Sequence, residues 1–115
     1  MERIEIRFLK SFCNILKEYQ NIFDEHLDYN EEIIPHVLMS EITAKLVENF
    51  ELGNEELVKK TLRFVDIEFK NAPNEIKNMI TVSMLENFPS TGDKNFNIRN
   101  NLSDNLRKEL EQVNY

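Results

Sequence analysis

Residues 75–88 read EIKNMITVSMLENF, and this stretch decides the fold. Its middle holds only two clearly polar side chains, Thr81 and Ser83, so a helix formed here is apolar around most of its circumference. A helix of that kind is buried in a globular protein. Asn74 can cap its start and Pro89 stops it, so we expect a central helix of about fourteen residues, roughly 21 Å long, that the other helices surround.

Outward from this stretch, apolar residues recur three or four positions apart in five further segments, which is the spacing of amphipathic helices. These segments are residues 3–19, a shorter piece around 22–27, and residues 35–51, 55–71 and 101–113. We therefore predict an all-α, single-domain bundle of five to six antiparallel helices around the central apolar helix at about 75–88. The similar lengths of 40–53, 55–71 and 75–88 leave a set of degenerate helical repeats open as an alternative.

The length of 115 residues fits one domain covering 1–115, with a polar loop at 89–100. The single Cys13 has no internal partner and lies among apolar neighbours, so we expect it to pack as a small hydrophobe in a reducing compartment. No apolar run approaches the roughly 20 residues of a membrane span, and the charged start MERIEIR lacks the apolar core of a secretion signal. These features predict a cytoplasmic protein that does not act at a membrane.

Few residues offer chemistry. His26 and His36 are ten residues apart and lack the short, repeated spacing of zinc ligands, so we expect no metal. Glu68 and Glu86 sit on largely apolar helix faces and, with His36, are the only acid or base candidates for an enzyme. No nucleophile motif and no Gly-rich phosphate loop accompanies them, and we expect each glutamate to be paired, hydrogen-bonded or at the rim of the core. The sequence therefore predicts a non-enzymatic protein without a cofactor.

Charge is distributed unevenly. Residues 20–60 carry three basic and ten acidic side chains, which accounts for the whole formal net charge of −7. Such a region favours a basic protein partner and disfavours nucleic acid, whose phosphates it repels, although a merely solvated face is the plain alternative. The candidate partner-binding residues form two clusters in the sequence, namely Asp24, Glu25, Asp28, Glu31 and Glu32, followed by Glu48, Glu51, Glu55 and Glu56.

Three short motifs carry a resemblance to a known family. At residues 34–39 (IPHVLM), 67–69 (IEF) and 76–86 (IKNMITVSMLE), the chain resembles a family of small bacterial proteins known only as a domain of unknown function. The resemblance covers about residues 8–88 and leaves the tail after Pro89 outside. It implies a single all-helical domain and supplies no catalytic residue. In size and acidity, such proteins are similar to the immunity proteins encoded beside bacterial polymorphic toxins.

These observations lead to one expected function and two alternatives. We expect an immunity protein whose acidic residues meet the Lys and Arg groups with which a toxin domain, such as a nuclease, holds phosphate. A helical scaffold or adaptor of an unrelated pathway, including a homodimer, is the second reading. An enzyme built on Glu68, Glu86 and His36 is the third. The identity of the partner and the oligomeric state do not follow from the sequence.

Overall fold

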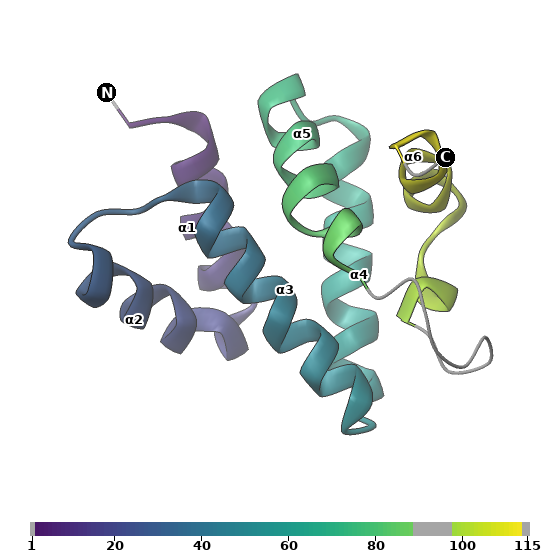
Figure 1. Ribbon diagram of the computed structural model, residues 1–115, viewed down its shortest axis with the longest axis horizontal. Coiled ribbons are helices and arrows are strands. Elements are labelled where there is room, and N and C mark those ends of the chain that lie inside the picture. Colours follow the sequence, from purple (N-terminus) through teal and green to yellow (C-terminus); the bar gives the residue numbers. More distant parts are fainter. Residues whose placement is uncertain (1, 89–97, 114–115) are drawn as a thin grey trace.

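The computed structural model describes the backbone of residues 2–88 and 98–113 and the side chains of these residues as far as residue 110. Within those ranges the chain is helical and contains no β-strand, so the all-α prediction is confirmed (Figure 1). The helices, in order, are α1 (Ile4–Ile15), α2 (Gln20–Asn30), α3 (Pro35–Glu51), α4 (Glu55–Lys70), α5 (Asn74–Ser83) and α6 (Asp104–Val113), with single 3-10 turns η1 (Lys17–Tyr19), η2 (Leu85–Asn87) and η3 (Ile98–Asn101).

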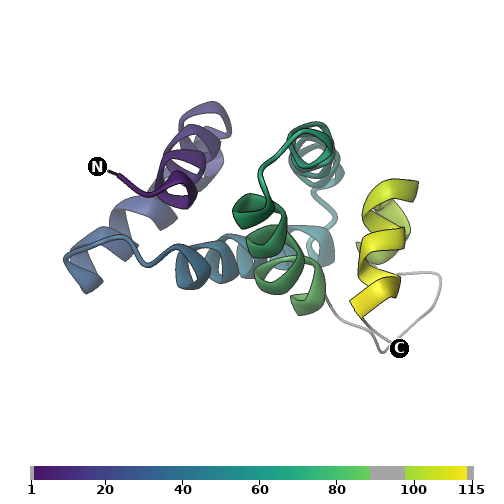
Figure 2. The ribbon, with the colours of Figure 1, turned by 90° about the horizontal axis from the view of Figure 1, so that it is seen from above.

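Helix α5 occupies the centre, as the sequence predicts. It packs against α1, α3 and α4, and its side chains Ile76, Met79 and Ile80 are buried. In the view of Figure 2, α3 and α5 form one layer. Helices α1 and α4 form a second layer, drawn toward the top of the picture, and are separated from each other. One side of α5 is open to solvent: Asn74, Glu75 and Asn78 are exposed, and so is Val82, at 45%.

The central helix ends at Ser83, five residues before the end that the sequence predicts. Met84 departs from helical geometry, with φ −118° and ψ −65°, and the η2 turn follows. The cause is side-chain competition for one carbonyl, because Ser83 O accepts hydrogen bonds from Thr43 Oγ1 at 3.2 Å and Asn87 Nδ2 at 2.8 Å. At the other end, Asn74 is the first residue of the helix and Pro73 takes the capping position, so the expected asparagine cap is wrong.

Helices α3 and α4 form the hairpin that the sequence predicts. Pro35 begins α3, and Gly53 provides the left-handed residue of the turn, with φ 83°. The predicted helix at residues 3–19, in contrast, breaks at Leu16. The break turns Tyr19 into the core, where its hydroxyl donates to Thr61 Oγ1 at 2.8 Å, and burial raises the pKa of Tyr19 to about 12.

The chain after α5 returns to the body of the protein. The predicted last helix begins at Asp104 rather than near residue 101, and Ser103 Oγ accepts a hydrogen bond from the Leu106 amide at its start. Leu106 and Leu110 are buried, and α6 packs against η2. Residues 89–97 of the expected loop lie outside the described residues, but its end forms the η3 turn with Ile98 buried. No helix in the described ranges is long and apolar enough to cross a bilayer.

Candidate functional site

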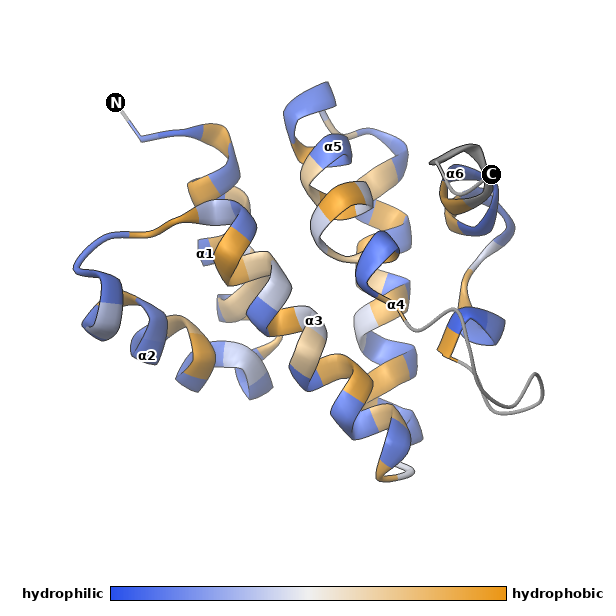
Figure 3. Cartoon of the chain, viewed as in Figure 1, coloured by the Kyte–Doolittle hydropathy of each residue, from blue (hydrophilic) through white to orange (hydrophobic). Residues whose placement is uncertain are grey.

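Five of the nine acidic candidates lie together on helix α2 and the two residues that follow it. Residues 20–44 contain no Lys or Arg, and the next cation, Lys45, is engaged elsewhere, with its Nζ 2.5 Å from Glu18 O. All five carboxylates are exposed, and in the described part of the chain none forms an ion pair. Figure 3, which colours the backbone by hydropathy, shows that much of α2 consists of hydrophilic residues. We call this the α2 surface: Asp24, Glu25, Asp28, Glu31 and Glu32.

Two apolar side chains interrupt the α2 surface. Tyr29 is 89% exposed, and Leu27, two residues earlier, is 40% exposed. Tyr29 lies four residues after Glu25, so the two share one side of the helix. Sequence reasoning missed Tyr29, because an exposed tyrosine looks the same in a sequence as a buried one. Tyrosine surrounded by polar groups is a residue type that often contributes most of the binding energy at protein interfaces.

A buried histidine fixes the α2 surface to the rest of the protein. His26 Nε2 accepts a hydrogen bond from the Ile34 amide at 3.0 Å, so its proton is on Nδ1, which donates to Glu41 Oε1 at 2.7 Å. Asn30 Nδ2 also donates to His26 O at 2.9 Å. These bonds tie α2, the following loop and α3 together, so the acidic side chains project from a rigid support.

Glu31 holds an unfavourable backbone conformation. Its φ is 64°, in the left-handed region, where it ends α2 with a hydrogen bond from its amide to Leu27 O at 2.8 Å. A non-glycine residue pays on the order of 1 kcal/mol for this conformation, and glycine or asparagine is favoured there. Folding stability alone therefore does not favour a glutamate at position 31.

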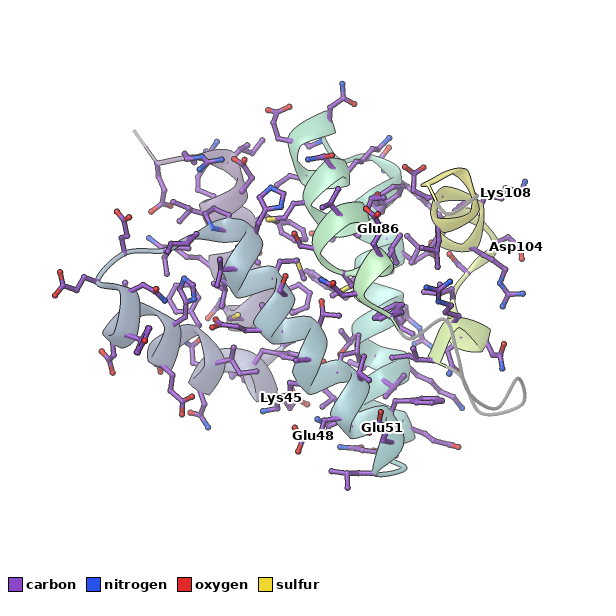
Figure 4. All side chains as sticks on the ribbon, viewed as in Figure 1. Lys45, Glu48, Glu51, Glu86, Asp104 and Lys108 are labelled. Carbon is purple, nitrogen blue, oxygen red and sulfur yellow. The ribbon has the colours of Figure 1, made fainter. Side chains whose placement is uncertain are left out.

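The other four acidic candidates lie elsewhere. They lie at and just after the far end of α3, whose 17 residues span about 25 Å, so the two clusters do not form one patch. Glu48 and Glu51 project from the last turns of α3, with Lys45 close to Glu48 (Figure 4). Both glutamates line a hollow that Thr43 and Asn87 also line. Glu55 and Glu56 begin α4, where carboxylates stabilise the positive end of the helix dipole, and each lines a hollow that also contains Lys59.

The acid and base candidates do not form a shared site. His36 Nδ1 is 2.7 Å from the hydroxyl of Ser83, which is only 4% exposed. Glu68 lines a hollow between α1 and α4, whereas Glu86 projects into solvent from η2 (Figure 4). Among the described side chains, no hydrogen bond or ion pair joins any two of His36, Glu68 and Glu86.

Near His36 the structure holds a carboxylate that sequence reasoning missed. Glu5 is 8% exposed, and its side chain accepts from Arg3 at 2.6 Å. A hydrogen bond from the Glu5 backbone amide, helped by Arg3 and by the nearby His36, holds the pKa of the Glu5 carboxyl below its ordinary value. The group is therefore a carboxylate satisfied by its neighbours rather than a proton donor.

Cys13 is buried, as predicted for a core residue, and burial raises the pKa of its thiol to about 12. Across residues 2–88 and 98–110, no three side chains of His, Cys, Asp or Glu gather in a way that could hold a metal ion.

Comparison with known proteins gives one match. A family model described as "Domain of unknown function (DUF7674)" matches residues 9–115. This match includes the tail after Pro89, so the expectation that the family likeness stops near residue 88 is wrong. No curated protein matches the chain, and no solved structure matches it.

Proposed function

We propose that this chain, which belongs to the DUF7674 family, is a non-enzymatic binding protein that neutralises a bacterial toxin by covering its basic active site with the α2 surface. It would act in the cytoplasm, where the toxin would otherwise reach its target. The family carries no known activity, so the proposal depends on the surface and its charge.

The observation that carries the proposal is an acidic surface without a neutralising cation. Five exposed carboxylates lie within nine residues, in a segment that contains no Lys or Arg. Like-signed charges gathered in this way attract an oppositely charged protein over distances of about 10 Å, raise the rate of association and repel acidic proteins. A nuclease is a fitting target, because its active site presents Lys and Arg groups to phosphate.

The same helix can also supply the contact that excludes substrate. Helix α2 has 11 residues and is therefore about 16 Å long, which suits insertion into an active-site cleft. Tyr29 would fill an apolar position between the basic groups of the toxin, flanked by the carboxylates. The anchor at His26 keeps the helix in place, so little order would be lost on binding.

A scaffold or adaptor is the second candidate. It is favoured by two exposed isoleucines, Ile15 and Ile67, which lie away from the α2 surface and are 53% and 57% exposed. The genes beside this one separate the two candidates. A toxin gene next to it favours neutralisation, and a housekeeping operon favours the adaptor.

The test uses the product of the adjacent gene. We would co-express it with this protein, isolate the complex by gel filtration and measure inhibition of the toxin activity. The decisive variant is Asp24→Asn/Glu25→Gln/Asp28→Asn. Its control, Glu48→Gln/Glu51→Gln/Glu55→Gln, removes the same charge from the end of α3 and the start of α4. We expect only the first to lose inhibition. Full inhibition by the first variant, or no complex with the wild-type protein, would refute the proposal.

A further inference from the structure

Helices α1 and α4 are separated by a groove, and no residue of the α2 surface lines it. The two helices lie apart above the α3 and α5 layer (Figure 2). One hollow of about 370 Å³ lies between Ile4 and Asn71, and a second of about 450 Å³ lies between Ile15 and Lys60. The start of α1 thus faces the end of α4, so the helices run antiparallel and the hollows follow one another along them.

Aromatic rings form the floor of this groove. Phe8 lines the first hollow and Phe64 the second, and their ring centroids are 6.5 Å apart, so this pair joins the two hollows. Phe12 lies beneath, 5.4 Å from Phe64 and fully buried. At one end, Ile15 and Ile67 are more than half exposed although both line the hollow. The apolar floor is therefore continuous with the core and open to solvent.

The rim has the opposite charge to the rest of the protein. The chain has 14 basic and 21 acidic residues, yet the groove is lined by four cations and two carboxylates. Lys60 is paired with Glu18 at 3.1 Å, but Arg7, Lys59 and Arg63 form no ion pair within the described residues. The cations are Arg7, Lys59, Lys60 and Arg63, and the carboxylates are Glu56 and Glu68.

We infer that the groove between α1 and α4 docks an amphipathic helix of a partner protein, with apolar residues along one face and Asp or Glu on both flanks. The apolar face would cover Phe8, Phe64 and Ile67, and the acidic flanks would pair with Arg7 and Arg63. Helix α1 has 12 residues, so the groove is about 18 Å long and accommodates roughly three turns of the partner helix. This surface is separate from the one in the proposed function.

A helix fits these features better than nucleic acid or a lipid surface does. Glu56 and Glu68 lie in the rim and would repel a continuous row of phosphates, whereas a helix can place its acidic residues only where cations stand. The floor is concave, so a flat membrane would leave Phe8 and Phe64 uncovered.

The test uses a synthetic, fluorescein-labelled peptide of about fourteen residues, with Leu at positions i, i+3, i+4 and i+7 and Glu on the flanks. Its binding is measured by fluorescence anisotropy and mapped by amide NMR shifts of the full-length protein. The test variants are Ile67→Ser and Arg63→Glu. Their controls are Val82→Ser and Lys108→Glu, which change exposed residues outside the groove.

We expect saturable binding, amide shifts confined to α1 and α4, and weakening on the order of tenfold in both test variants but in neither control. The variant Asp24→Asn/Glu25→Gln/Asp28→Asn should bind the peptide as the wild type does, which separates this inference from the proposed function. The inference is overturned by no binding, by equal binding of a peptide with Lys in place of Glu, or by equal binding of single-stranded DNA or anionic vesicles. It is also overturned by a dimer of the free protein that Ile67→Ser dissociates, since a second copy would then fill the groove.

Discussion

The α2 surface and the α1–α4 groove differ in charge and in their relation to the core. The α2 surface is a set of carboxylates on a helix tied to the protein through His26, whereas the groove is floored by rings that belong to the core. The net charge of −7 describes neither of them, because one surface carries most of it and the other reverses it. One net charge can therefore conceal two surfaces that suit partners of opposite charge.

The largest expected difference between the two regions is in stability. Replacing Phe12 by Ala should lower the free energy of unfolding by about 3–5 kcal/mol, because it opens a cavity beneath the groove. Tyr29→Ala on the α2 surface should change it by less than about 0.5 kcal/mol, because Tyr29 is 89% exposed. Urea unfolding of both variants measures this. Similar decreases in the free energy of unfolding would mean that the groove is no more a part of the core than the α2 surface is.

The next effect concerns the anchor of the α2 surface. We expect His26→Ala to lower the free energy of unfolding by about 2–3 kcal/mol, because the Ile34 amide and Glu41 both lose a partner. Glu41→Gln keeps an acceptor for Nδ1–H and should lose less than about 1 kcal/mol. Hydrogen exchange at the Ile34 amide should quicken only in the first variant. Unchanged protection there would show that His26 does not hold the loop.

Alkaline pH should weaken the side of the protein that lies under the groove. Burial raises the pKa of Cys13 from 9.0 and that of Tyr19 from 10.0, each to about 12. Both groups favour folding in their protonated forms, so their contribution is complete below pH 9 and is lost as the pH rises toward 12. At pH 10 the loss is about 1.4 kcal/mol from Cys13 and about 0.4 kcal/mol from Tyr19, so Cys13→Val should remove most of the total. Urea unfolding from pH 8 to 11 measures the slope, and equal slopes in both proteins would contradict the assignment to Cys13.

The smallest effect is expected at Glu31, where one substitution should raise stability and weaken binding. Glu31→Asn suits the left-handed backbone and should raise the free energy of unfolding by about 0.5–1 kcal/mol. It also removes one carboxylate, so association with a basic partner should slow. Glu32→Gln removes the same charge without the change in backbone preference and should leave stability unaltered. A lower melting temperature for Glu31→Asn would contradict the statement that the left-handed backbone at position 31 is unfavourable for glutamate.

The parts of the fold that the sequence predicts well are set by local signals. Helices α3 and α4 match their expected bounds closely, because Pro35 and Gly53 mark their ends and the apolar spacing is regular. The breaks at Leu16 and Ser83 were missed because distant side chains cause them. Tyr19 turns inward to reach Thr61, and Ser83 O is taken by a threonine 40 residues away.

The surfaces were predictable only in part. The acidic clusters can be read from the sequence, but their separation depends on the direction of α3, which places Glu31 and Glu51 at opposite ends. The groove depends on α1 lying opposite α4, and no local pattern shows that. One residue did point to the groove in the sequence: Ile67 is apolar but lies outside the buried face of its helix.

The central claim is that the α2 surface attracts a basic protein, and the rate of association tests it most directly. Stopped-flow mixing with the toxin domain from the adjacent gene would give the association rate constant between low and physiological salt. The association rate constant of the wild-type protein should fall on the order of tenfold over this range. That of Asp24→Asn/Glu25→Gln/Asp28→Asn should be lower and depend little on salt. Equal rates for the two proteins, with equal dependence on salt, would contradict it.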